Sequence, residues 1–132
     1  MTTQAYPFYT SIPSVAVKAA AAAKAQAAIL YIPQIQDGPR NVGKTYVPEL
    51  RHSDMSLHTI VADIASAQHE NVVRVLAIDV DTGSSWDATK EVAHLVLDVV
   101  LEDEHHVPDW CRDFLEEHLG VNYIRAAERG AA

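Results

Sequence analysis

The chain has 132 residues, a length that suits a single domain with a sizeable core. Its composition is 48% hydrophobic and 21% charged, which excludes wholesale disorder, and its net charge of −8 disfavours nucleic acid or an anionic membrane as a direct partner. The single cysteine, Cys111, excludes an internal disulfide and favours a soluble protein in a reducing, cytoplasmic compartment.

The N-terminal segment, residues 1–13, predicts an extended arm. Two prolines interrupt any strand pattern, and proline lacks the N–H group that a central strand needs. The aromatic side chains of this arm are candidate contacts with a protein partner or a second copy of the chain: Tyr6, Phe8 and Tyr9.

An alanine-rich stretch then predicts a helix over about 15–31. Alanine has the highest helix propensity, Ser14 suits the N-cap, and Pro33 marks the end of the helix. Its lysines and weakly apolar alanines favour a soluble helix over a membrane span. The alanine face, Ala19–Ala28, allows close approach of another backbone and therefore a possible homodimer contact.

Residues 33–52 are rich in proline and glycine and predict a long loop, with a brief strand expected at Tyr46 and Val47. A helix is expected next, over about 55–68, with Ser53 or Asp54 as its cap. Its apolar residues recur at i, i+3, i+4 and i+7, which places them on one face of a helix: Leu57, Ile60, Val61 and Ile64.

Residues 72–87 predict a β-hairpin around which the rest is organised. Val72–Val80 is the most β-branched run in the chain, and its apolar residues suggest burial on both faces for part of its length. The turn after this run has Gly83 available for a positive φ, and Trp86 then lies on the return strand.

Two further helices are expected, over about 88–102 and 108–119. The first has Asp87 or Ser85 as its expected cap and an acidic outer face. Its apolar stripe is formed by Val92, Leu95, Val96, Val99 and Val100. The second has Pro108 in its first turn, Gly120 after its end, and an inner face expected to include Trp110 and Cys111. The tail, residues 125–132, is expected to be disordered, which leaves a single domain over 14–124.

The string from Gly38 to Thr45 has the spacing GxxxxGK[ST]. It resembles the phosphate-binding loop of P-loop nucleotide-hydrolysing proteins. The resemblance implies a backbone cradle around a phosphate, a lysine counter-charge, a hydroxyl on Mg²⁺ and an acid after an apolar strand. The residues that would fill these roles are Gly38, Gly43, Lys44, Thr45 and Asp79.

The surroundings of this string favour a simple loop. A phosphate cradle follows a strand and opens a helix. The preceding segment is alanine-rich, and Pro48 would remove a needed N–H group from a helix that began at Thr45.

A second string, Asp81-Thr-Gly-Ser-Ser, resembles the active-site sequence of the aspartic proteases. That family uses two carboxylates that share a proton, so the resemblance implies a dimer. The string leads directly into a predicted helix, whereas the family is almost entirely β. Asp, Thr, Gly and Ser are also the common residues of ordinary turns, which is the interpretation that we adopt.

Metal ligation has weak support in the sequence. His105, His106, Cys111 and His118 lie within fourteen residues. The last two are seven residues apart, which separates them by about 10 Å along a helix and prevents them from gripping one ion unaided. No metal or other cofactor is therefore expected.

These observations predict an α+β fold, with a small antiparallel sheet at about 72–87 packed against three to four helices. The leading interpretation is a non-enzymatic binding or regulatory module that acts through protein–protein contacts. One alternative is a P-loop-like nucleotide-binding protein. The other is an acidic inhibitor that imitates nucleic acid and contacts a basic protein through Asp98, Glu102 and Asp103.

Overall fold

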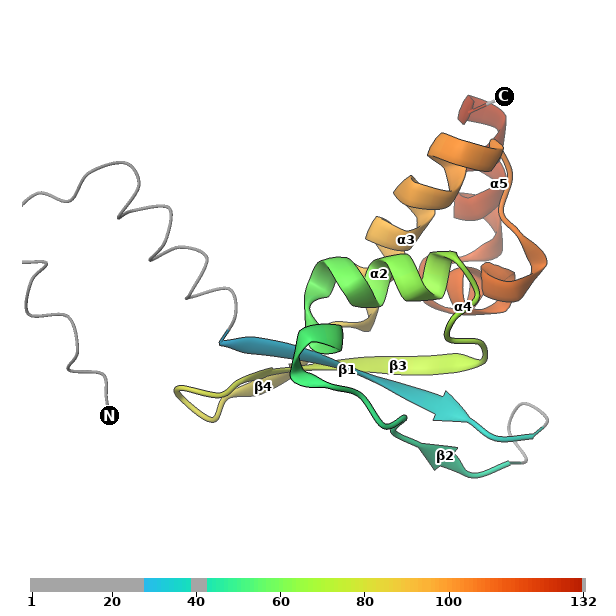
Figure 1. Ribbon diagram of the computed structural model, residues 1–132. Coiled ribbons are helices and arrows are strands. Elements are labelled where there is room, and N and C mark those ends of the chain that lie inside the picture. The colour runs from blue at the N-terminus through green and yellow to red at the C-terminus, as the bar shows by residue number, and fades with distance from the viewer. Residues whose placement is uncertain (1–27, 39–42, 132) are drawn as a thin grey trace, which may run out of the picture.

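The computed structural model describes residues 28–38 and 43–131, and it confirms the α+β class (Figure 1). Four antiparallel strands form one sheet in the order β2-β1-β3-β4. The strands are β1 Ile29–Gln36, β2 Thr45–Tyr46, β3 Val72–Asp79 and β4 Ser85–Asp87, and the helices are η3 His52–Met55, α2 Leu57–Ala65, α3 Thr89–Glu104, α4 Asp109–Leu119 and α5 Val121–Ala131.

The β3–β4 hairpin confirms the prediction for residues 72–87. Trp86 pairs with Ala77, so the tryptophan does lie on the return strand. The turn is closed by Asp79, whose Oδ1 accepts hydrogen bonds from the backbone N–H groups of Asp81 (3.0 Å) and Thr82 (3.4 Å). Gly83 has φ +77°, the left-handed conformation that glycine adopts at little cost.

Strand β1 corrects the predicted helix over 15–31 at its C-terminal end. Residues 29–31 belong to an eight-residue strand, and Pro33 lies inside that strand instead of ending a helix. Residues 15–27 lie outside the described part of the chain. The predicted loop over 33–52 is therefore also too long, because its first four residues complete β1. The brief strand expected at Tyr46 and Val47 is present one residue earlier, as β2 at Thr45–Tyr46.

Pro33 fits this strand because its missing N–H group has no ladder bond to make there. Pro33 pairs with Val75, and Val75 directs both of its backbone groups away from β1. The Val75 carbonyl accepts from the Ala88 N–H (2.9 Å), and the Val75 N–H donates to Thr89 Oγ1 (2.9 Å). On its other side β1 pairs with β2 only at Ile35 and Gln36, so Pro33 faces no strand of the described chain there.

Helix α2 has the predicted apolar face but begins later than expected. Ser56 is its N-cap and accepts from the Thr59 N–H (3.2 Å), whereas Ser53 and Asp54 belong to the short helix η3 before it. Three members of the predicted stripe, Ile60, Val61 and Ile64, are buried, and Leu57 is partly buried against the core.

Helix α3 has most of its predicted stripe buried, with one exception. Val92, Val96 and Val100 lie in the core, but Val99 is 38% exposed. Asp87 takes the capping role expected of it by accepting from the Thr89 N–H (2.9 Å), although Ala88 occupies the N-cap position.

Helix α4 also departs from its predicted inner face at one position. Cys111, Phe114 and Leu115 are buried, whereas Trp110 is 45% exposed. The Trp110 indole Nε1 donates to the Ala65 carbonyl (2.9 Å), which attaches the start of α4 to the end of α2. Gly120 ends α4 with φ +95°, as predicted.

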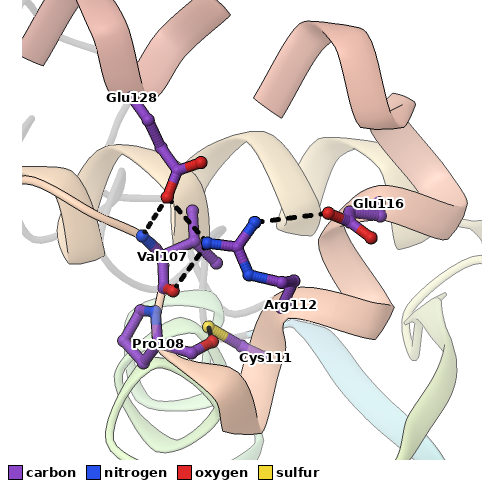
Figure 2. Close-up of polar contacts among 6 residues, drawn as sticks. All are labelled: Val107, Pro108, Cys111, Arg112, Glu116 and Glu128. Atoms are coloured by element: carbon purple, nitrogen blue, oxygen red, sulfur yellow. Dashed lines mark hydrogen bonds and ion pairs between the residues drawn. The ribbon is translucent and has the colours of Figure 1, made fainter. Parts of the chain in front are cut away.

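Helix α5 corrects the predicted disordered tail over residues 125–131, whereas Ala132 lies outside the described residues. The helix continues to Ala131, and Ile124 is fully buried. Figure 2 shows a polar tie that holds it: Glu128 Oε2 accepts from Arg112 Nη2 (2.7 Å) and from the Val107 N–H (2.9 Å). Arg112 also donates to the Val107 carbonyl (3.1 Å) and to Glu116 (3.3 Å), so α5, α4 and the α3–α4 connection are joined.

All the described helices lie on one side of the sheet (Figure 1). Tyr31, Val75 and Ala77 face them and belong to the core. Within residues 28–38 and 43–131, no helix is long and apolar enough to cross a membrane.

Candidate binding site

The P-loop-like string lies in the hairpin that connects β1 to β2. Its last residue, Thr45, is paired with Gln36 in the sheet, and no helix starts there. The Asp37 N–H donates to the Lys44 carbonyl (2.7 Å), and the backbone at Asp37 approaches Gly43 so closely that a Cβ atom would have no room. Hairpin closure therefore accounts for this glycine without a phosphate.

The other residues of the nucleotide-binding hypothesis are separated. Thr45 Oγ1 accepts from Gln34 Nε2 (2.9 Å), and Lys44 is beside it at the end of β1. Asp79 pairs with Ile29 at the start of β1, whereas Thr45 pairs with Gln36 at its end, so the two residues are separated by about 23 Å at roughly 3.3 Å per residue. The Asp79 carboxylate instead accepts hydrogen bonds within its own turn. The string that begins at Asp81 is the exposed turn of the second hairpin.

The most unusual backbone of the described chain is the turn between α2 and β3, residues 66–71. Ala67 has φ +68° and Asn71 has φ +58°. Asparagine tolerates this left-handed region, but alanine has a Cβ atom and adopts it at a cost. The Asp63 carbonyl holds the turn by accepting from the N–H groups of Gln68 (2.8 Å) and His69 (3.2 Å).

His69 brings a polar group into this turn. Its side chain is 11% exposed, and its Nε2 lies 3.7 Å from Asp63 Oδ2, which is too long for a hydrogen bond. Among the described residues this nitrogen is the buried side-chain polar atom that has no hydrogen-bond partner. The turn therefore places an available donor or acceptor beside a carboxylate.

Two hollows flank the turn and share Glu70 and Asn71. The narrow hollow, of about 150 Å³, lies between the turn and the start of α4. It combines the carboxylates of Glu70, Asp109 and Asp113 with the ring of Trp110. Asp109 and Asp113 are four residues apart on α4, so their side chains share a face of the helix.

The wide hollow, of about 440 Å³, lies between the turn and the β1–β2 hairpin. Asp37, Glu49 and Glu70 contribute its charge, and the lining also includes His69 and Tyr46. Of the residues that the structure describes, no lysine or arginine lines either hollow. Both hollows therefore suit a cationic ligand and repel an anionic one.

The interface candidates from the sequence lie elsewhere. Asp98, Glu102 and Asp103 are exposed on α3, as their pattern predicts. The aromatic residues of the arm lie outside the described part of the chain: Tyr6, Phe8 and Tyr9.

The candidate metal ligands of the sequence are His105, His106, Cys111 and His118. Within the described residues no three histidine, cysteine or acidic side chains are grouped to hold an ion. Cys111 is buried, and this burial raises the pKa of its thiol to about 11, which keeps the sulfur protonated. A protonated thiol is a poor metal ligand and a poor nucleophile.

Sequence reasoning missed the narrow hollow because it assigned Trp110 to the core. One signal was present, the spacing of Asp109 and Asp113 around Trp110, which puts two acids on one helix face beside an aromatic ring. Glu70 could not be added to them from sequence, because the packing of α4 against α2 brings it there.

The chain was compared with known proteins at three levels. No family model matches it, no curated protein matches it, and no solved structure matches it. Any function proposed for the chain therefore depends on its own residues and their geometry.

Proposed function

We propose that the protein is a non-catalytic binding module that contacts a basic segment of a partner protein through the narrow hollow. The observation that carries this proposal is the combination of three carboxylates with one exposed indole ring, at Glu70, Asp109, Asp113 and Trp110. Three carboxylates beside an aromatic ring support recognition of a cation.

An arginine side chain has the chemistry that this hollow would recognise. Its planar guanidinium group stacks on an aromatic face and donates to carboxylates at the same time, whereas a lysine ammonium is a compact, strongly hydrated charge. The Trp110 ring is held in place, because its Nε1 already donates to the Ala65 carbonyl. A fixed ring loses little conformational freedom when a ligand stacks on it.

The test is a titration of the full-length protein with a synthetic arginine-rich peptide and a lysine-rich peptide of the same length and charge. Binding is followed by calorimetry and by the indole N–H resonance of Trp110. The arginine peptide is expected to bind more tightly, with an affinity that falls as salt is raised. Absence of binding, or equal binding of the two peptides, would refute the proposal.

A pair of charge-matched variants locates the contact. Asp113→Asn is expected to lower the affinity for the arginine peptide about fivefold. This factor corresponds to the loss of one partly exposed ion pair of about 1 kcal/mol. Asp98→Asn removes the same charge from the exposed face of α3 and is expected to change little. If instead Asp98→Asn weakens binding and Asp113→Asn does not, the acidic face of α3 is the contact surface, as the inhibitor hypothesis requires.

A further inference from the structure

The sheet has an apolar face that none of the described helices covers. Leu30 pairs with Ile78, and Ile32 pairs with Leu76, so these four side chains form two neighbouring pairs on one face of β1 and β3. All four are half-buried, and none belongs to the core cluster or packs against it. The described helices lie on the opposite face (Figure 1).

This face is apolar at one end and polar at the other. The next pair along, Gln34 and Arg74, is hydrogen-bonded (3.2 Å), and Gln34 also donates to Thr45 Oγ1 (2.9 Å). The uncovered apolar area therefore lies beside the beginning of β1. A sheet with apolar side chains on both faces is normally covered on both, because each exposed side chain forgoes a favourable transfer from water.

We propose that residues 1–27 of the same chain cover this face. The segment joins the sheet directly at its apolar end: the Val80 N–H donates to the Ala28 carbonyl (2.9 Å), which fixes the junction beside the Leu30–Ile78 pair. Twenty-seven residues exceed the length needed, since β1 spans roughly 26 Å at about 3.3 Å per residue.

The composition of the segment suits this role. It contains two bases, Lys18 and Lys24, and no acid, whereas residues 28–132 contain eight bases and eighteen acids. The segment is therefore attracted to the rest of the protein. Its alanines allow close approach to a sheet, and its aromatic side chains supply apolar area.

A second copy of the chain is the competing occupant of the same face. The covalent connection favours the segment, because a tethered group has an effective concentration in the millimolar range. Intramolecular and intermolecular docking predict different results when labelled and unlabelled chains are mixed.

The experiment measures nuclear Overhauser effects in the full-length protein, between residues 1–27 and the methyl groups of Leu30, Ile32, Leu76 and Ile78. We expect these effects in a uniformly labelled sample and expect none in an isotope-filtered sample of mixed labelled and unlabelled chains. Their absence from the uniform sample overturns the proposal. Their presence in the mixed sample also overturns it, because a second copy then occupies the face.

A pair of variants gives an independent readout by limited trypsin digestion at Lys18 and Lys24. Ile32→Gln weakens the apolar face and is expected to speed cleavage about tenfold, since cleavage follows the population of the undocked form. Val99→Gln changes an exposed valine of α3 in the same way and is expected to leave the rate unchanged. Equal rates in the two variants would contradict docking on this face.

Discussion

The tie at Glu128 offers the sharpest test of the described fold, because it holds the helix that the sequence did not predict. In the variant Glu128→Ala, the buried Val107 N–H loses its acceptor, and Arg112 loses its shortest ion pair. An unsatisfied buried N–H costs about 1–3 kcal/mol, and a partly exposed ion pair contributes at most about 1 kcal/mol. We therefore expect the free energy of unfolding to fall by about 2 kcal/mol.

The assay is urea denaturation at pH 7, with thermal unfolding as a second measurement. For a chain of this size, 1 kcal/mol corresponds to roughly 3–6 °C, so the expected fall in Tm is roughly 6–12 °C. Glu128→Gln keeps an oxygen that can accept from the Val107 N–H and removes only the charge. It is expected to lose about half as much stability as Glu128→Ala.

The difference in unfolding free energy between wild type and Glu128→Gln should depend on pH, and the structure sets the direction of this dependence. The hydrogen bond from Arg112 is the main reason why the pKa of Glu128 lies below its ordinary value of 4.5. A carboxyl group whose pKa is lowered by folding stabilises the native state above its unfolded-state pKa, and this stabilisation is lost as the pH falls through the folded-state pKa. The stability gap between wild type and Glu128→Gln should therefore be full at pH 7 and shrink below pH 4.5.

The control is Glu102→Ala, which removes an exposed carboxylate from α3. It is expected to change the free energy of unfolding by less than about 0.5 kcal/mol. If Glu128→Ala destabilises no more than this control, the tie does not hold α5, and the packing described for residues 121–131 is refuted.

Two further predictions concern the strained turn and the buried thiol. Ala67→Gly should stabilise the protein by about 0.5–1 kcal/mol in urea denaturation, because the left-handed φ of Ala67 is cheap for glycine; a loss of stability would show that the turn is not left-handed there. Cys111 should react with a thiol reagent at pH 8 only as fast as the protein unfolds, because the residue is 1% exposed and burial also raises its pKa to about 11; rapid reaction in the native protein would contradict its burial.

The sequence predicted those elements whose signals are local. The β3–β4 hairpin depends on a β-branched run followed by turn residues, and Gly83 and Gly120 have the positive φ angles expected of them. The cores of α2 and α3 agree with their apolar periodicity, with Val99 as the exception. The buried face of α3 also includes Ala93 and Leu97, which the predicted stripe did not contain.

The sequence failed where a distant partner decides the conformation. In the sequence, Pro33 indicates the end of a helix. In the structure it lies in β1 opposite Val75. Proline is acceptable there because the backbone groups of Val75 bond to Ala88 and Thr89 and need no partner on β1. Residues 125–131 look too polar to be ordered on their own. They are ordered because Ile124 is buried and because Glu128 reaches Arg112 and Val107 across the chain.

The candidate site could not be predicted from the sequence either, because segments far apart in the chain form it. Its geometry also links the strained backbone at Ala67 to ligand binding. The turn must leave α2 and enter β3 while its Asn71 carbonyl accepts from the Gln36 N–H (3.0 Å). This path places Glu70 between the two hollows, opposite Asp109 and Asp113. A glycine at position 67 would relieve the strain but would also enlarge the range of conformations open to the turn. If the site requires Glu70 to be held in place, Ala67→Gly should raise stability and weaken the arginine peptide together, whereas a turn with no role in binding would show the stability gain alone.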